Sequence, residues 1–183
     1  MNKSLLWAFS LITAACMAAV AQPRQVEAMK DSSVVIYRMV HPLHEIEAKS
    51  KEVIYRVRIN PAERLVLSVA AEVDVTTFDS GNSNRDSHAM EVIDAITYPD
   101  AVFTGTSITQ QGDSLHVAGK LTFHGVTKEI VVVLRQEWNG NTLHVTGGWD
   151  VSLTAFKIER PSLLMIPVED NLHFSLAAVF AWQ

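Results

Sequence analysis

Three residues in the first third of the chain carry side chains suited to holding a metal ion: His41, His44 and Glu45. Neutral imidazoles and a carboxylate are ligands that zinc accepts. Pro42 stands between the histidines and indicates a turn or a strand end, so the spacing does not place both rings on one face, as it would on a helix. We therefore predict no metal and no cofactor, and a metal-dependent or hydrolytic enzyme is the least favoured function.

Nucleophilic catalysis has little support in the sequence. Asp86, Ser87 and His88 are suitable residue types, but adjacent helical positions point in different directions and do not form a relay. The chain contains no Gly-x-Ser-x-Gly motif and no glycine-rich phosphate loop. We predict no catalytic residue, and we expect solvated imidazoles on the outward rows of strands at His116, His124, His144 and His173.

Residues 1–21 have the features of a cleavable signal peptide. Lys3 provides a positive start, Leu5–Ala21 is largely apolar, and Ala19-Val20-Ala21 forms a small-x-small cleavage site. An uncleaved anchor is the alternative, but the apolar segment is short for a membrane span. We expect cleavage after Ala21, a periplasmic or secreted protein, and no stable membrane span in the mature chain.

The predicted mature chain, residues 22–183, has the length of one domain and no long linker. Cys16 is the only cysteine and lies in the leader, so the mature chain would contain no thiol. Lipid attachment at Cys16 is a minority interpretation, because Thr13 stands where lipoprotein signals usually have Leu. The 20 acidic residues outnumber the 15 basic ones, which argues against a nucleic-acid partner.

Apolar residues alternate with polar ones through most of the mature chain, which indicates half-buried strands. Turn signals at 111–113 and 139–141 separate alternating segments and predict hairpins. The pattern favours an all-β, antiparallel, closed or nearly closed sheet of about eight strands. The clearest strand segments are 53–59, 65–75, 115–123, 130–134, 145–153 and 172–182.

One segment departs from this pattern and predicts a short helix over 86–97. Ala89, Met90, Ile93 and Ile96 fall near one helical face. We expect Asp86 to cap its start and Pro99 to lie just beyond its end. Such a helix would lie across the mouth or flank of a barrel.

Periodicity alone does not distinguish a packed barrel interior from one that holds a ligand. Motifs on either side of the predicted helix add information here. They resemble the YceI-like family of bacterial lipid-binding barrels, and they suggest a divergent branch, because residues 34–44 and 160–164 depart from the family pattern. The matching residues are Arg85, Asp86, His88, Tyr98, Pro99, Phe103, Gly119, Leu121, Thr122, Gly125, Val126, Thr127 and Lys128.

The resemblance implies a lipocalin-like extended barrel that holds a long isoprenoid or similar lipid chain. Arg85 either contacts a polar lipid head at the mouth or pairs with a nearby acid or strand-end carbonyl, and the structural role is favoured. The remaining candidate ligand contacts are the inward rows of the predicted strands: Leu121, Phe123, Ile130, Val132, Leu134, Trp149, Val151, Leu153, Phe174 and Leu176.

The favoured function is therefore an exported binding protein that sequesters or carries an apolar chain, such as an isoprenoid, fatty acid or fatty amide. Burial of the chain would dominate its affinity. The alternative is a packed barrel that acts through its surface as an interaction or stress-response module. The sequence leaves a homodimer open.

Overall fold

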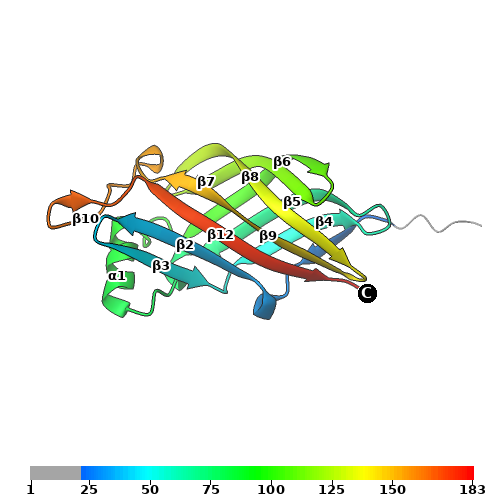
Figure 1. Ribbon diagram of the computed structural model, residues 1–183, viewed down its shortest axis with the longest axis horizontal. Helices are drawn as coiled ribbons and strands as arrows, with labels where there is room; N and C mark the ends of the chain where they lie inside the picture. Colours follow the sequence, from blue (N-terminus) through cyan, green and yellow to red (C-terminus); the bar gives the residue numbers. More distant parts are fainter. Residues whose placement is uncertain (1–21) are drawn as a thin grey trace, which may run out of the picture.

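The computed structural model describes residues 22–183, and its main feature is one strongly curled, antiparallel sheet of ten strands (Figure 1). The predicted leader, residues 1–21 with Cys16, lies outside the described residues. The strand order is β1-β4-β5-β6-β7-β8-β9-β12-β2-β3. The strands are β1 (Arg24–Glu27), β2 (Val34–His41), β3 (His44–Ser50), β4 (Ile54–Asn60), β5 (Leu65–Asp74), β6 (Asp100–Gln111), β7 (Ser114–Phe123), β8 (Val126–Asn139), β9 (Thr142–Ser152) and β12 (Asn171–Ala181).

Strict alternation of side chains explains how the sheet buries one face. In β7, Leu115, Val117 and Leu121 are buried, while His116 and Lys120 between them are exposed. The predicted antiparallel all-β fold is confirmed, with two strands more than the expected eight. The additional strands are β1, which has only four residues, and β3, whose sequence HEIEAKS is mostly polar.

The two outer strands of the sheet do not remain open along their whole length. Directly after β1, Ala28 pairs with Phe180 of β12, so the sheet closes on itself at this end. At the other outer strand, Lys49 of β3 pairs with Asp79: the Lys49 N–H donates to the Asp79 carbonyl at 3.0 Å, and the reverse bond is 2.9 Å long. Pairing of this kind removes unsatisfied backbone groups from the edges.

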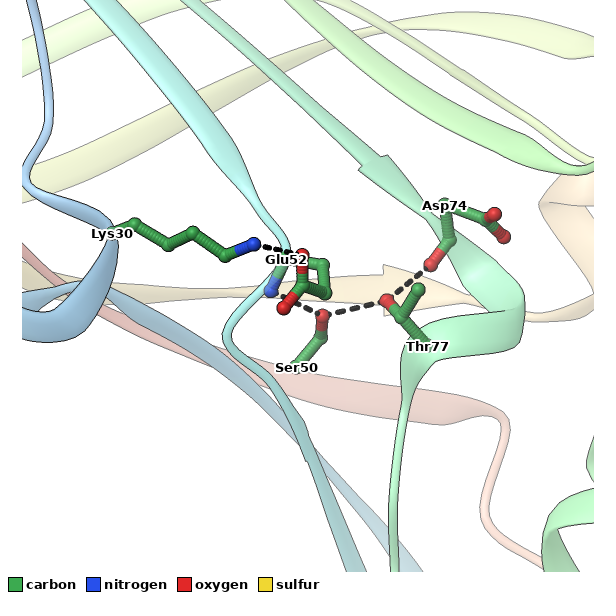
Figure 2. A network of polar contacts seen from close by, with 5 residues as sticks. All are labelled: Lys30, Ser50, Glu52, Asp74 and Thr77. Carbon is green, nitrogen blue, oxygen red and sulfur yellow. Dashed lines mark hydrogen bonds and ion pairs between the residues drawn. The ribbon is translucent and has the colours of Figure 1, made fainter.

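Side chains reinforce the junction beside the Lys49–Asp79 pair (Figure 2). The Thr77 hydroxyl, in the short 3₁₀ helix η2 (Val75–Thr77), donates to the Asp74 carbonyl at 2.6 Å. The buried Ser50 hydroxyl therefore donates to Thr77 at 2.6 Å and accepts the Glu52 N–H at 3.1 Å. Lys30, in the 3₁₀ helix η1 (Lys30–Ser32), pairs with Glu52 at 2.5 Å on the surface. The network ties the β3–β4 turn to the end of β5.

The helix α1 (Ser83–Val92) begins earlier than the sequence predicts. Asn82 is its N-cap, and its side-chain oxygen accepts the Arg85 N–H at 3.1 Å, so the prediction of Asp86 as the cap was wrong. Both Asn and Asp are strong caps, and the chain turns at Gly81, where φ is +77°, which places Asn82 at the start. Asp86 lies in the first helical turn instead.

The helix also ends sooner than the predicted boundary at Thr97. Asp94 adopts a left-handed conformation with φ of +45°. The Asp94 N–H then donates to the Glu91 carbonyl at 3.1 Å, and the Ala95 N–H to the Met90 carbonyl at 3.0 Å. These two bonds form a Schellman motif, which ends the helix.

Between β9 and β12 the chain forms two small elements at one end of the sheet. They are a 3₁₀ helix, η3 (Thr154–Phe156), and a hairpin of β10 (Ser162–Leu163) with β11 (Ile166–Pro167). In Figure 1 this hairpin projects beyond the sheet at the end where α1 and the β2–β3 turn lie. Among residues 22–183, no helix combines the length and apolar character needed to cross a membrane.

Candidate ligand-binding cavity

A cavity of about 360 Å³ lies between the curled sheet and α1. Its wall consists mostly of apolar side chains from strands on opposite sides of the cavity and from the helix. The exposed residues His44, His88 and Ser162 also line it, which places its opening between the β2–β3 turn, α1 and the β10–β11 hairpin. Of the predicted ligand contacts, the following residues line this cavity: Arg85, Leu121, Phe123, Trp149, Leu153 and Phe174.

A second void of about 80 Å³ lies deeper inside the sheet, with no polar residue in its wall apart from Tyr55 and Trp149. Of the predicted contacts, it is lined by Leu121, Ile130, Val132, Leu134, Trp149 and Leu176. Val151 lines neither space. It is only 2 % exposed and packs in the core cluster that includes Phe156 of η3 and Ile158.

Five residues line both spaces and therefore form the partition between them: Tyr55, Ala71, Phe103, Leu121 and Trp149. Gly119 makes room for one of the rings, because a Cβ atom there would lie 2.4 Å from Cζ of Phe103. The Trp149 indole stacks on Phe174 with ring centroids 5.3 Å apart and an interplanar angle of 9°. The partition is thus mostly aromatic.

Two polar groups inside this apolar region differ in how they are satisfied. The Tyr55 hydroxyl donates to the Val34 carbonyl at 3.3 Å, and burial raises the pKa of this hydroxyl. The Trp149 indole N–H is buried and has no hydrogen-bond partner among residues 22–183. A buried donor of this kind is costly unless something accepts from it.

Arg85 and Asp86 are held by one residue at the rim of the cavity. The Arg85 Nε and Nη2 groups donate to the Ser80 hydroxyl and carbonyl at 2.8 and 2.7 Å. The Asp86 carboxylate accepts from the Ser80 N–H at 3.2 Å and from the Ser80 hydroxyl. Burial, with a further contribution from Asp86, raises the pKa of the neighbouring Tyr37 hydroxyl, so a neutral phenol lines the rim.

The family model for the YceI-like domain matches residues 27–180 of this chain. The chain belongs to the YceI-like family. A UPF0312 protein of Vibrio cholerae is 33 % identical over 109 residues, covering 55 % of this chain and 58 % of that protein. The YceI protein of Escherichia coli O157:H7 is 28 % identical over 99 residues, covering 50 % and 52 %. The chain thus aligns with little more than half the length of these relatives.

Solved structures show that the YceI-like fold extends over most of the chain. BcnA of Burkholderia cenocepacia superposes with a TM-score of 0.75 at 24 % identity, covering 83 % of this chain and 98 % of BcnA. A polyisoprenoid-binding domain from Saccharophagus degradans gives a TM-score of 0.65 at 11 % identity, covering 87 % and 98 %. At these identities the likeness establishes the fold alone.

His41 and His44 of this YceI-like domain pair across the β2–β3 hairpin with ring centroids 5.1 Å apart, so the prediction that both rings do not share one face was wrong, but His41 has structural partners. His41 is 3 % exposed, and its Nδ1 accepts the Leu43 N–H at 3.1 Å. Nε2 therefore carries the proton and donates to the Ile166 carbonyl at 3.0 Å. Glu45 pairs with Arg38 at 3.0 Å. Within residues 22–183 there is no group of three His, Cys, Asp or Glu side chains arranged to hold a metal.

Sequence reasoning missed the part of the YceI-like cavity that the N-terminal strands and α1 provide. Tyr37 and Met39 of β2 line it, as do Met90 and Ile93 from the helix segment. The predicted apolar helix face was a signal that could have identified Met90 and Ile93, whereas β2 has apolar residues in both rows and gave no clear signal for Tyr37 and Met39. Ile96, predicted on that same face, lies beyond the end of the helix and is 98 % exposed.

Proposed function

We propose that this protein is an exported, periplasmic binding protein that holds one apolar chain, such as an isoprenoid, fatty acid or fatty amide, inside its sheet. The cavity of about 360 Å³ with its apolar wall is the observation that carries this proposal. Burial contributes about 0.8 kcal/mol per methylene removed from water, so a long chain binds without many polar contacts. The polyisoprenoid-binding domain of Saccharophagus degradans, which has the same fold, supports this ligand class.

The polar groups suggest how such a ligand is oriented. Its head lies at the rim, where Arg85 and the neutral hydroxyl of Tyr37 line the cavity. The Arg85 Nε and Nη2 groups are engaged by Ser80, so the guanidinium mainly holds the backbone of the rim in place, and Tyr37 is the polar group that can meet an oxygen of the head. Deeper in the cavity, the buried Trp149 N–H favours a ligand with an acceptor part-way along its chain.

The same geometry favours binding over catalysis. Both ring nitrogens of His41 are engaged, and Ser80 bonds both Arg85 and Asp86. A general base must be able to reach the proton that it removes from a substrate. These side chains instead support the backbone around the cavity mouth, as a binding site requires.

Ligand uptake is tested by native mass spectrometry of the purified protein and by titration with a fluorescent fatty acid. Ala89 faces the cavity from α1, so Ala89→Trp should fill part of it and weaken probe binding. Ser87→Trp, at an exposed position of the same helix, is the matched control and should bind like the wild type. Wild-type protein that carries no adduct and takes up no probe would instead support the packed, surface-acting module.

Export is tested separately by fractionation of cells that produce the full chain. We expect the mature protein in the periplasmic fraction, with Gln22 as its N-terminal residue. Mature protein that retains residues 1–21, or that remains in the cytoplasm, would contradict this part of the proposal.

A further inference from the structure

The tip of the β10–β11 hairpin exposes two large apolar side chains beside the cavity mouth. Leu164 is 76 % exposed and Met165 is 96 % exposed. From Pro161 to Val168 the chain contains no charged residue. The hairpin projects away from the sheet (Figure 1), so the tip is a convex protrusion rather than a groove. Exposed apolar groups of this kind mark sites of contact with another surface.

The backbone of the tip adds a second, independent observation. Leu163 pairs with Ile166, which leaves a two-residue turn with φ of +52° at Leu164 and +69° at Met165. Positive φ at both central residues is typical of type I′ turns, which strongly prefer Asn-Gly. Large side chains in this conformation destabilise the turn. Local folding therefore does not account for Leu and Met here.

The tip is also continuous with the opening of the cavity. Leu163 lines the cavity, and the His41 side chain bonds the Ile166 carbonyl at 3.0 Å. This bond joins the hairpin to the β2–β3 turn, whose Leu43 is 61 % exposed. At the base of the hairpin, Arg160 Nε donates to the Val168 carbonyl at 2.8 Å. The apolar tip is therefore held in place next to the mouth.

We propose that Leu164, Met165 and Leu43 dock onto the surface of a lipid bilayer, so that a ligand passes between the membrane and the cavity without crossing water. This inference rests on the proposed binding of an apolar chain. A convex, uncharged tip enters a fluid interface more readily than a preformed protein pocket, and the ligand itself comes from an apolar phase.

The charges around the hairpin define the kind of membrane. Lys157 and Arg160 are the nearest basic residues in sequence, and Glu159, Glu169 and Asp170 are the nearest acidic ones. Within residues 157–170 the two basic residues are outnumbered by three acidic ones, so this segment forms no basic cluster that would favour anionic lipid. Docking should occur on zwitterionic phosphatidylcholine vesicles, depend weakly on salt, and be reversible because few side chains insert.

The decisive variant is the double substitution Leu164→Asn with Met165→Gly. It supplies the residues that a type I′ turn prefers, so the protein should fold at least as well as the wild type. Val131→Ser is the matched control, because Val131 is 60 % exposed on the outer face of β8 and does not line the cavity. Flotation with phosphatidylcholine vesicles and the rate of fatty-acid transfer from vesicles are measured for all three proteins.

We expect the double variant to lose roughly a hundredfold in vesicle binding, with a corresponding fall in transfer rate, because each of the two apolar side chains removed from water contributes about a decade. Its affinity for a probe added in solution should equal that of the wild type, and Val131→Ser should behave as the wild type in every assay. Equal vesicle binding by the double variant, or no binding by the wild type, would overturn the docking inference. A wild-type protein that fails to bind the probe in solution would instead overturn the proposed function.

Discussion

Leu121 provides the sharpest test of how the interior is divided, because it lines both the cavity and the inner void. Leu121→Ala removes part of the partition and joins the void of about 80 Å³ to the cavity. That void has room for about three methylene-sized groups, at roughly 30 Å³ each. At about 0.8 kcal/mol per methylene, a ligand long enough to fill it gains about 2 kcal/mol, or roughly thirtyfold in Kd.

Leu134→Ala is the matched control for this substitution. Leu134 is 6 % exposed and Leu121 is 8 % exposed, but Leu134 lines only the inner void. Either substitution should lower the free energy of unfolding by about 2–5 kcal/mol, as buried Leu→Ala changes do. Only Leu121→Ala should make longer chains bind more tightly.

The assay is a competition titration with unbranched fatty acids of increasing length, together with a urea unfolding curve for each variant. We expect the length of highest affinity to increase for Leu121→Ala and to stay unchanged for Leu134→Ala. The same shift in both variants would show that the inner void is already accessible. No shift in either would show that the ligand does not reach the partition.

Three further predictions concern the rim and the adjacent loop. Asn82→Ala should lower the free energy of unfolding, measured by urea denaturation, by about 1 kcal/mol through loss of the helix cap. Ser83→Ala, at the next residue, removes no capping side chain and should have little effect. Arg85→Ala should lower the melting temperature and weaken the binding of all ligands alike, because the guanidinium holds Ser80. Selective loss of binding of ligands with an anionic head, at unchanged stability, would show instead that Arg85 contacts the ligand head. The hydrogen bond from the Ser152 hydroxyl, with those from Thr154, lowers the pKa of Asp170 in the folded protein. The carboxylate of Asp170 therefore stabilises the fold above its unfolded-state pKa, and this stabilisation is lost as the pH falls through the folded-state pKa. Asp170→Asn should flatten the acid limb of a curve of unfolding free energy against pH.

The sequence predicted the central strands well because their two faces differ sharply. In β7 every second residue is apolar, so the alternation identifies both the strand and the row of side chains that faces inward. In β2, by contrast, apolar residues occupy both rows of the sequence VVIYRMVH, and the inward row of Tyr37 and Met39 was ambiguous. β3 was missed because most of its residues are polar, although Ala48 and Ser50 are buried.

Prediction of an inward position is also different from prediction of a ligand contact. Val151 does point into the core, but it packs in the cluster that contains Phe156 of η3 and lines neither space. Leu134 likewise faces the interior, but only the inner void. These differences depend on the position along the barrel and on the residues packed against each strand, and strand periodicity contains no information about either.

The β10–β11 hairpin was unpredictable for a related reason. Turn chemistry favours Gly, Asn or Asp where φ is positive, and Leu164-Met165 violates that preference. Local and global preferences agree through most of a natural sequence, so a local violation indicates a function more often than an error of folding. The violation here lies next to the cavity mouth.

The middle strands of the sheet and its β3 edge differ in how many interactions hold them, and this difference indicates where the sheet opens first. From β6 to β9 each strand pairs along most of its length with its neighbours, so opening there would break many backbone hydrogen bonds together. β3, the last strand of the sheet, is joined to the segment before α1 by the isolated Lys49–Asp79 pair and by the hydroxyl contact of Ser50 with Thr77 (Figure 2). Local opening follows the region with the fewest interactions to break. Separation of β3 from this segment would release the β3 edge from the chain that leads into α1, while the rest of the sheet keeps its hydrogen bonds.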